Sequence, residues 1–310
     1  MAAILVIKLG ALGDFVQALG PFAAIRRHHA GDRITLLTTP PFADLARASG
    51  FFDAVETCGR PATLDVRGWA RLLRVLNAGY ARVYDLQTSD RSSFYRSLIA
   101  PFGARPEWSG IARGASHPHA NADRDLMHTI DRQRDQLAMA GIGDVPPPEL
   151  SWANADVTRF GLKRPYVLIV PGGSAHRPEK RWPADRFAAL ARRMTESGIV
   201  PVLLGGRDEA DLLDTIARQA PGTVSLAGKT NLLDIAALAR GAKAAVGNDT
   251  GPMHLIAAAG IPAIVLFSAA SDPALCAPRG PFAESTVTVL RAAALGDLTE
   301  ATVARALDLV

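Results

Sequence analysis

Three glycine-containing segments carry side chains that could bind an anion or move a proton. The first runs from Lys8 through Gly10 and Gly13 to Asp14, between a strand-like run and a helix-like run. Its glycines allow a sharp turn and a close approach to a ligand, and its G-x-x-G-D spacing differs from the G-x-G-x-x-G fingerprint of dinucleotide sites. The sequence leaves two interpretations of Asp14 open. It caps the helix, or it accepts a proton as a general base.

The second segment, residues 170–183, is rich in glycine and cations. Gly173 and Ser174 offer backbone N–H groups and a hydroxyl, and Lys180 and Arg181 follow just before a predicted helix. Backbone donors together with cations suit a diphosphate. The competing interpretation is a solvated basic loop without a ligand.

The third segment, residues 246–254, enters a helix directly after a strand-like run. We expect Thr250 to cap this helix, and Pro252 is tolerated in the first turn because its missing N–H would have no partner there. The remaining free N–H groups and the positive end of the helix dipole favour an anion. His254 lies one helical turn further on and could reach the same anion.

Alternating strand-like and helix-like stretches position these segments. The apolar run at residues 3–9 predicts a buried strand, and apolar residues at helical spacing follow at 15–29. Three consecutive prolines at 146–148 can continue neither kind of element and predict a linker. Before it we expect strands at residues 34–38 and 82–86 and helices at 64–78 and 123–140; after it we expect strands at 166–170, 199–204, 224–226, 244–246 and 263–267 and helices at 184–197, 209–218, 232–240, 251–259 and 298–309.

This alternation predicts an α/β fold with two Rossmann-like domains, each a parallel sheet flanked by helices, and a ligand cleft between them. We place the domains at residues 1–148 and 149–310, which fits the usual domain size for a chain of 310 residues. Ligands of such sheets collect at the carboxyl ends of the strands. All three segments follow predicted strands and are therefore candidate sites.

The composition favours a folded enzyme. Hydrophobic residues make up 48% of the chain and charged residues 21%, and the net charge of +4 suits an anionic partner. Nucleic acid is not the expected partner, because aromatic residues make up only 6% and basic runs interleaved with aromatics are missing. The two distant cysteines favour a reducing, cytoplasmic location, and no apolar run reaches the roughly 18 residues that span a membrane.

Two local patterns imitate metal sites. His117 and His119 stand near His128 but without a second cluster of ligands. The run 123–125, Asp-Arg-Asp, lies in a predicted charged helix and not at a strand end. We therefore expect no metal site and no cofactor.

Taken together the motifs resemble the bacterial heptosyltransferases of glycosyltransferase family 9, which add heptose from an ADP-sugar to the lipopolysaccharide core. The family's first strand followed by G-D is similar to residues 5–14. The remaining matches are Asp85 and Gln87 for its D-x-Q, Ser174, Lys180 and Trp182 for its phosphate loop, and Gly247, Asp249, Thr250, Gly251 and His254 for its signature G-x-D-T-G-x-x-H.

The resemblance implies a GT-B fold and an inverting transfer without a metal, with the acceptor on the first domain and the donor on the second. It implies an ADP-sugar donor, a lipopolysaccharide core or other glycan acceptor, and peripheral contact with the cytoplasmic face of the inner membrane. The implied residues are Asp14 as general base; Ser174, Lys180, Asp249, Thr250, Gly251 and His254 for the diphosphate; Glu209, Leu226 and Lys229 for the ribose and base; and Gly13, Asp85, Gln87 and Arg91 on the acceptor side.

Other functions fit parts of the pattern. A transferase or epimerase of the same fold could use another nucleotide-sugar, whereas a two-domain binding protein would have no use for Asp14. Asp208 competes with Glu209 for the ribose. Four arginines are candidates for reading an acidic acceptor, with solvated surface arginines as the competing interpretation: Arg60, Arg67, Arg91 and Arg113.

Overall fold

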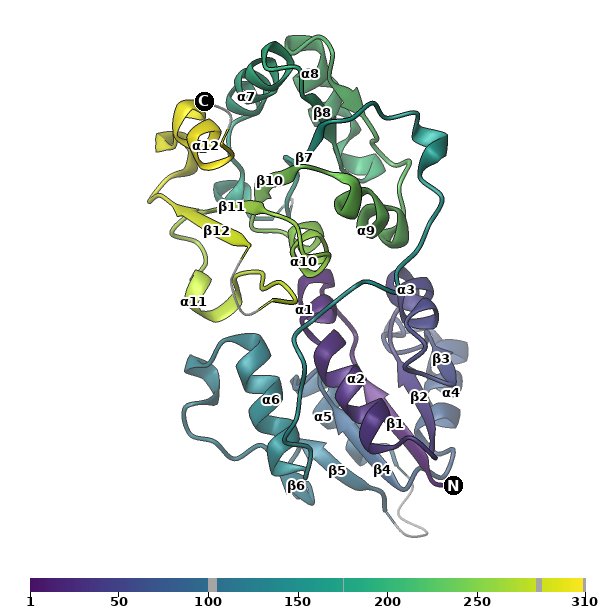
Figure 1. The fold of residues 1–310 in the computed structure, drawn as a ribbon. Helices are drawn as coiled ribbons and strands as arrows, with labels where there is room; N and C mark the ends of the chain where they lie inside the picture. Colours follow the sequence, from purple (N-terminus) through teal and green to yellow (C-terminus); the bar gives the residue numbers. More distant parts are fainter. Residues whose placement is uncertain (100–104, 175, 283–285, 309–310) are drawn as a thin grey trace. The chain divides into compact units, whose positions relative to one another are not determined.

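The computed structural model describes residues 1–99, 105–174, 176–282 and 286–308. The chain forms two compact units, Met1–Pro146 (unit 1) and Pro147–Val310 (unit 2). The division lies two residues before the boundary that we placed after residue 148. Figure 1 shows the elements of each unit, and every strand pair among the described residues is parallel.

Unit 1 is built on a six-stranded sheet with the order β3-β2-β1-β4-β5-β6. This is the strand order of the Rossmann fold, whose ligand site lies where the order reverses, between the first and fourth strands. Here β1 pairs with β4 from Ile4 opposite Arg82 to Ile7 opposite Asp85. The strands are β1 (Ala3–Ile7), β2 (Arg33–Leu37), β3 (Ala54–Glu56), β4 (Arg82–Asp85), β5 (Glu107–Gly110) and β6 (His117–Pro118).

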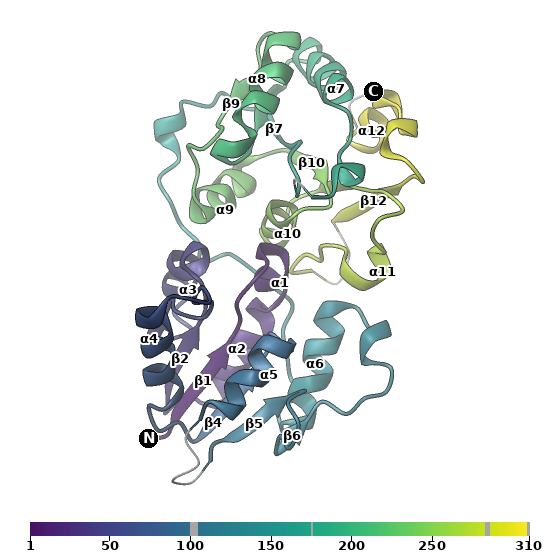
Figure 2. The same ribbon diagram turned by 180° about the vertical axis from the view of Figure 1, so that it is seen from behind.

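Helices cover both faces of this sheet. In Figure 1, α1 (Leu12–Gln17), α2 (Leu19–His28) and α6 (Thr129–Met139) lie on one face, and Figure 2 shows α4 (Val66–Leu76) and α5 (Asp90–Ser97) on the other. On that second face Leu72, Tyr95 and Trp108 belong to one buried cluster together with the apolar side chains of β1. Unit 1 also contains α3 (Ala43–Ala48) and single 3₁₀ turns at Pro40–Phe42 and Arg124–Leu126.

Two expected helices of unit 1 are interrupted. The helix that we expected at 15–29 is divided at Ala18 into α1 and α2, and Pro21 in the first turn of α2 has no N–H with which to continue an unbroken ladder. The helix expected at 123–140 is a 3₁₀ turn followed by α6, because Met127 is extended and His128 caps α6 by accepting the N–H of Ile130. The single-helix predictions were therefore wrong at both places.

Unit 2 repeats the same design. Its sheet has the order β12-β11-β10-β7-β8-β9, so its first and fourth strands, β7 and β10, again lie side by side. The strands are β7 (Tyr166–Val170), β8 (Val200–Leu203), β9 (Val224–Ser225), β10 (Ala244–Asn248), β11 (Ala263–Phe267) and β12 (Val287–Arg291); the helices are α7 (Ala184–Glu196), α8 (Ala210–Gln219), α9 (Leu232–Gly241), α10 (Gly251–Ala258), α11 (Pro273–Cys276) and α12 (Glu300–Ala306).

Sequence patterns located most of unit 2 to within two residues. Strands β7, β10 and β11 are buried at every position, as expected for parallel strands covered on both faces. The expected terminal helix at 298–309 begins later, at Glu300, because Thr299 caps it through the N–H of Thr302; position 309 lies outside the described residues. Trp182 and Phe187 pack edge to face within the core that joins α7, α8 and α12 to the sheet.

Candidate functional site

The predicted site residues gather at the switch point of each sheet. In unit 1, Lys8 follows β1 and Asp85 ends β4. In unit 2, Pro171 follows β7 and Asn248 ends β10. Strand order alone therefore brings segments that are about 77 residues apart in sequence to one edge of each sheet.

Side chains from the end of β4 hold the loop that follows β1. Gln87 Oε1 accepts the N–H of Leu9 at 2.8 Å, and Lys8 Nζ donates to the carbonyl oxygen of Leu86 at 3.0 Å. Gly10 has φ +109, and a Cβ there would lie 2.6 Å from the ring of Phe42, so only glycine fits this turn. The D-x-Q motif thus fixes the path of the loop that leads to Asp14.

Asp14 is the third residue of α1, and its side chain both makes a capping contact and lines a cavity. Its Oδ2 accepts the N–H of Ala11 at 3.2 Å, which is a helix-capping contact. The same side chain lines a small cavity at the carboxyl edge of the sheet. Both interpretations of Asp14 are therefore compatible with its position in the fold.

The cavity has a volume of about 60 Å³ and a mostly polar lining from α1, α6 and the segments that follow β1 and β4. Four lining residues come from α6 and were not predicted. Their spacing of i, i+3, i+4 and i+7 places them on one helix face. We expected a charged surface helix here, and this polar stripe was the sequence signal that could have indicated the cavity. The lining consists of Lys8, Asp14, Leu86, Gln87, Thr88, Thr129, Arg132, Gln133 and Gln136.

Burial shifts the pKa values of three ionisable groups at or beside this cavity. The pKa of Lys8 is lowered by burial, and the negative charge of Asp14 is the largest influence that opposes the change. Burial also lowers the pKa of Arg132, with the nearby Arg124 acting in the same direction. Burial raises the pKa of Asp85 to about 6, although its carboxylate accepts the N–H groups of Gln87 and Thr88. Such perturbed groups cluster at functional sites.

The other acceptor-side predictions lie outside the cavity lining. Asp85 is buried below it, and its backbone oxygen accepts a hydrogen bond from Gln136 at 3.0 Å. Gly13 lies beside Asp14 in α1. Arg91 is exposed on α5. Of the four predicted residues, Gln87 alone lines the cavity.

In unit 2, Asn248 fixes the loop that follows β7. Its Nδ2 donates to the carbonyl oxygens of Pro171 and Gly172, at 2.8 and 3.1 Å. Its Oδ1 accepts the N–H of Trp182 at 3.0 Å. These contacts join both ends of the 171–182 loop to the end of β10. Neither the burial of Asn248 nor its bridging role was predicted.

Lys180 and Asp249 form an ion pair, with Nζ 2.6 Å from Oδ2 and side chains that are only 13% and 8% exposed. Ser271 Oγ, which we did not predict, donates to the same carboxylate oxygen at 2.7 Å. The sequence assigned both Lys180 and Asp249 to a diphosphate. In the structure Asp249 pairs with this cation beside the start of α10, and the assignment of both residues to a diphosphate stays a prediction.

The start of α10 differs in one respect from expectation. Thr250 precedes the helix, but its side chain makes no capping hydrogen bond, and Oγ1 is buried without a partner among the described residues. The capping prediction for this hydroxyl was wrong, although the extended backbone of Thr250 is typical of an N-cap residue. Gly251 opens the helix and His254 is buried one turn later. Ser174 is exposed on the loop after β7.

Glu209 joins two strand-end loops of unit 2. One carboxylate oxygen accepts the N–H of Gly173 and the other that of Gly206, both at 2.9 Å. Leu226 is buried after β9, and Lys229 is exposed with Nζ 3.4 Å from the Ser225 oxygen. All three predicted ribose and base residues thus lie on the loops after β8 and β9, on one side of the 171–182 loop.

The histidines singled out in the sequence serve local contacts. His119 Nε2 lies 2.9 Å from Asp135, and His117 Nε2 lies 3.6 Å from Glu107. Within the described ranges, no group of three or more His, Cys, Asp or Glu side chains is placed to hold a metal ion. The same ranges contain no helix with the length and apolarity needed to cross a membrane.

Two tandem Rossmann-type sheets form the GT-B architecture, and solved structures share this fold. A glycosyltransferase of family 9 from Veillonella parvula superposes with a TM-score of 0.83 at 21% identity, covering 99% of this chain and 96% of that one. An Escherichia coli heptosyltransferase solved with ADP gives 0.77 at 22% identity and covers 99% of both chains.

The chain belongs to glycosyltransferase family 9 (heptosyltransferase), whose family model matches residues 69–293. Among curated relatives, lipopolysaccharide heptosyltransferase 2 of Escherichia coli K12 is 29% identical over 218 residues. That match covers 62% of this chain and 61% of the relative, which is less than two thirds of the relative's length. The expected family, fold class and enzyme class are thereby confirmed.

Proposed function

We propose that this glycosyltransferase moves a heptose from an ADP-sugar to a lipopolysaccharide core acceptor, inverting the anomeric centre and using no metal. The observation that carries the proposal is the pair of switch-point sites, an acid–base cavity with Asp14 in unit 1 and a cation-bearing loop beside a helix start in unit 2. The name of the curated relative and the ADP in the solved relative support the choice of acceptor and nucleotide.

In the proposed donor site, the diphosphate binds at the start of α10. Backbone N–H groups and the helix dipole attract the anion there, and the buried Thr250 hydroxyl has a free hydrogen-bonding capacity. Ser174, Lys180, Gly251 and His254 complete the diphosphate set, while Asp249 pairs with the Lys180 ammonium group and competes with the diphosphate for it. Glu209, Leu226 and Lys229 lie on the loops assigned to ribose and base.

In the proposed reaction, Asp14 removes the proton from an acceptor hydroxyl as that oxygen attacks the anomeric carbon. The bond from this carbon to the diphosphate breaks on the opposite face, which inverts the configuration. Lys180 and the α10 N-terminus stabilise the negative charge that grows on the leaving group, so no metal is required. A positioned base contributes about 10²–10⁴-fold to the rate.

The acceptor is assigned to the cavity of unit 1. Gln87 holds the loop that leads to Gly13 and Asp14, Asp85 holds the loop after β4 by accepting the N–H groups of Gln87 and Thr88, and the exposed Arg91 of α5 is assigned to the acceptor side. Because the proposed acceptor is linked to lipid, the proposal includes peripheral contact with the cytoplasmic face of the inner membrane.

The test is transfer with purified enzyme, ADP-heptose and a lipopolysaccharide core acceptor in the presence of EDTA. We expect product of inverted configuration, and we expect Asp14→Asn to lose about 10²–10⁴-fold in kcat while ADP affinity is retained. Calorimetric titration with ADP, UDP and GDP tests the nucleotide. A preference for UDP or GDP would replace the donor, release of free epimerised sugar would favour an epimerase, and full activity of Asp14→Asn would remove the general base.

A further inference from the structure

Unit 2 has a cavity at the carboxyl edge of its sheet whose described lining contains no residue that the proposed function uses. Its volume is about 470 Å³, which lies within the range of small-molecule sites. The segments 268–270 and 293–296, which follow β11 and β12, form one part of the lining, and Glu179 and Arg181 form the rest. We call this cavity the β11–β12 pocket.

Backbone hydrogen bonds hold the floor of the pocket in place. Beyond the ends of the two strands, the Ala292 N–H donates to the Phe267 oxygen at 3.0 Å, and the Ala269 N–H donates to the Ala293 oxygen at 3.4 Å. Leu295 is buried in the core cluster of unit 2. Small exposed side chains leave space above this fixed floor: Ala269, Ala270, Ala293 and Ala294.

The pocket is next to the proposed diphosphate site. Lys180 ends a short 3₁₀ turn and pairs with Asp249. Its two chain neighbours, Glu179 and Arg181, line the pocket. Ser271, which directly follows the floor segment after β11, donates its Oγ to the same Asp249 carboxylate. Both walls of the pocket therefore lead to the Lys180–Asp249 ion pair.

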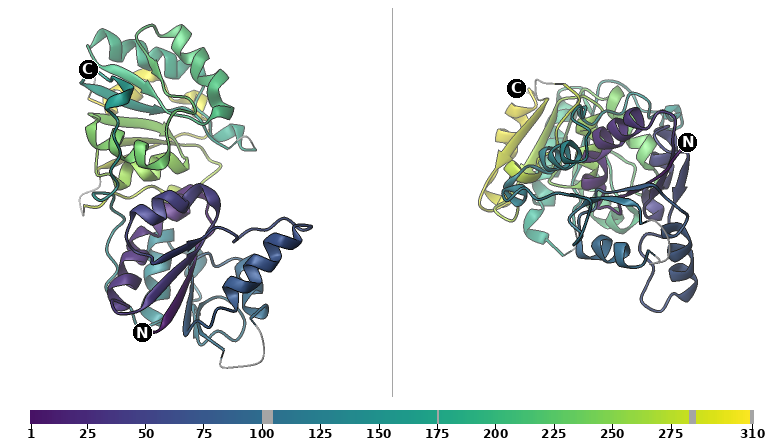
Figure 3. Two further views of the ribbon diagram at one scale, coloured as in Figure 1. Left: turned by 90° about the vertical axis from the view of Figure 1, so that its right-hand side faces the viewer. Right: turned by 90° about the horizontal axis from the view of Figure 1, so that it is seen from below.

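We infer that the β11–β12 pocket binds the exocyclic arm of the donor's heptose, an inference that rests on the proposed function. Figure 1 shows β11 and β12 on one side of β10 and β7 and β8 on the other, and the right-hand view in Figure 3 shows β12, in yellow, at the margin of unit 2. The proposed ribose and base residues lie on the loops after β8 and β9, and the diphosphate is assigned to the start of α10, just after β10. A donor that crosses the edge in this direction points its sugar toward the loops after β11 and β12.

The spacing of the strands fits the size of the sugar. Neighbouring strands lie about 4.8 Å apart, so the ends of β11 and β12 lie about 5 and 10 Å beyond the end of β10. The anomeric carbon stays beside the diphosphate, and the pyranose ring bridges the first interval. The two-carbon arm of a heptose then extends into the second.

The lining suits hydroxyl groups. Arg181 donates to the Gly173 carbonyl oxygen and keeps further N–H groups, because a guanidinium carries five. Glu179 is exposed, and its carboxylate is an acceptor only. Neither side chain forms an ion pair with any residue described. Adjacent hydroxyls, which both donate and accept, match this combination, whereas Glu179 would repel a further phosphate and the described lining offers no aromatic ring to a base.

The test is calorimetric titration of the full chain, without acceptor, with ADP, ADP-heptose and ADP-mannose, a hexose donor with a one-carbon arm. Glu179→Gln removes the charge of the acceptor group, and Ala293→Leu fills the pocket; both positions are exposed, so neither change disturbs the core. Each variant should bind ADP-heptose about tenfold more weakly. The affinity for ADP-mannose should fall by less than about threefold, and the affinity for ADP should stay within about twofold. Arg181 is left unchanged because it also holds Gly173.

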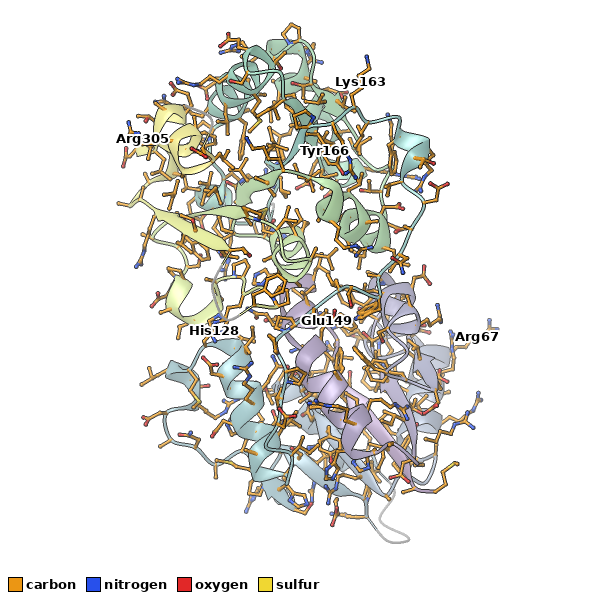
Figure 4. All side chains as sticks on the ribbon, in the orientation of Figure 1. Arg67, His128, Glu149, Lys163, Tyr166 and Arg305 are labelled. Atoms are coloured by element: carbon orange, nitrogen blue, oxygen red, sulfur yellow. The ribbon has the colours of Figure 1, made fainter. Side chains whose placement is uncertain are left out.

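Matched changes elsewhere in unit 2 are the controls. Glu196→Gln on α7 changes the net charge as Glu179→Gln does, and Arg305→Gln changes it in the opposite direction; both positions are exposed. Arg305 lies on the outside of unit 2 in Figure 4. Ala274→Leu enlarges an exposed alanine of α11 outside the described lining. All three should bind the three ligands like the unmodified chain.

Four results would overturn the inference. They are no binding of ADP-heptose by the unmodified chain, unchanged ADP-heptose affinity in both pocket variants, losses that are equal for ADP and ADP-heptose or equal in the controls, and losses that are equal for ADP-mannose, which would place the ring in the pocket instead of the arm.

Transfer assays distinguish this inference from the proposed function. If the unmodified chain transfers heptose to a lipopolysaccharide core acceptor while the pocket variants keep full affinity for ADP-heptose, the proposed function stands and the pocket assignment fails. If ADP-heptose binding depends on the pocket but no heptose is transferred, the pocket assignment stands and the proposed reaction fails.

Discussion

The Lys180–Asp249 ion pair predicts opposite effects on ADP affinity when either partner is removed. The pair is nearly buried and short, at 2.6 Å. Removing one partner of a buried pair costs about 3–5 kcal/mol, because the other charge is left uncompensated. Ser271 still donates to Asp249 after Lys180 is lost, so we place Lys180→Met at the low end, about 3 kcal/mol of unfolding free energy. Replacing both charges, with Lys180→Met and Asp249→Asn, should reduce the loss to about 1 kcal/mol.

Removal of Lys180 and removal of Asp249 should change the affinity for ADP in opposite directions. A diphosphate must compete with the Asp249 carboxylate for the Lys180 ammonium group. Lys180→Met removes a charge-assisted hydrogen bond of about 1.5–3 kcal/mol, so ADP should bind about 10–100-fold more weakly. Asp249→Asn releases Lys180 to the ligand, and ADP should bind about threefold to tenfold more tightly. Titration calorimetry with ADP in EDTA measures both changes, and urea unfolding of the single and double variants measures the coupling.

One pattern of results would refute this reasoning. If Asp249→Asn weakens ADP binding as much as Lys180→Met does, then Asp249 does not compete with the diphosphate for the Lys180 ammonium group, and it contributes to donor binding instead. If the double variant is destabilised by the sum of the two single changes, the pair carries no coupling energy. As a control, Arg186→Met removes the exposed partner of Glu300, an ion pair whose side chains are 36% and 26% exposed, and should change ADP affinity by less than about twofold.

Three further changes test the loops at the switch points. Gln87→Leu leaves the Leu9 N–H without its acceptor and should lower kcat about tenfold. Gln87→Glu keeps an acceptor oxygen but adds a negative charge near Asp14, so the pH profile of kcat should shift upward. An unchanged profile with full activity in both variants would contradict the positioning role of Gln87. Burial raises the pKa of Asp85 to about 6, so the stabilising effect of the protonated carboxyl is lost as the pH rises through 6. Asp85→Asn should therefore raise the unfolding free energy at pH 8 by up to about 3 kcal/mol and leave it little changed at pH 4. Urea unfolding at both pH values measures this difference. Glu209→Gln turns an NH₂ group toward Gly173 or Gly206, whose N–H groups both need an acceptor. The free energy of unfolding should fall by about 1–3 kcal/mol in thermal unfolding, and ADP should bind about tenfold more weakly. Undiminished ADP affinity would contradict a role of the Glu209 contacts in donor binding.

The sequence predicts unit 2 better than unit 1 for a physical reason. Strands covered on both faces must be apolar throughout, and β7 accordingly occupies the predicted residues 166–170. The strands that we missed are short or partly exposed. β5 is the sequence Glu-Trp-Ser-Gly at 107–110, and β12 has only intermediate and exposed positions at the sheet edge. Such strands owe their existence to pairing with a neighbour and not to their own composition.

The site was predictable where it depends on strand ends and not where it depends on packing. Lys180 and Thr250 stand at strand-to-helix turns, and such turns are readable from the order of the elements. The contribution of α6 depends on how that helix packs across the ends of β1 and β4, which no local pattern encodes. The sequence analysis therefore did not predict Arg132 and Gln133 as cavity residues, although their spacing with Thr129 places all three on one polar face of the helix.

Both units use the same device at the switch point, a carboxamide at the end of the fourth strand that holds the loop after the first. In unit 1 Gln87 accepts from Leu9, and in unit 2 Asn248 donates to Pro171 and Gly172. Loops at this point leave for opposite faces of the sheet, as α1 and α5 do in unit 1 (Figures 1 and 2), so their backbones separate and cannot continue the ladder of hydrogen bonds. A side chain must bridge the gap. In unit 1 the Lys8 ammonium group also bridges this gap, by donating to the Leu86 oxygen. A neutral amide adds a second bridge without a further charge beside the proposed general base or the proposed diphosphate. The two amides thus fix each loop through neutral groups, which leaves the local charge to Lys8 and Asp14 in unit 1 and to Lys180 and Asp249 in unit 2.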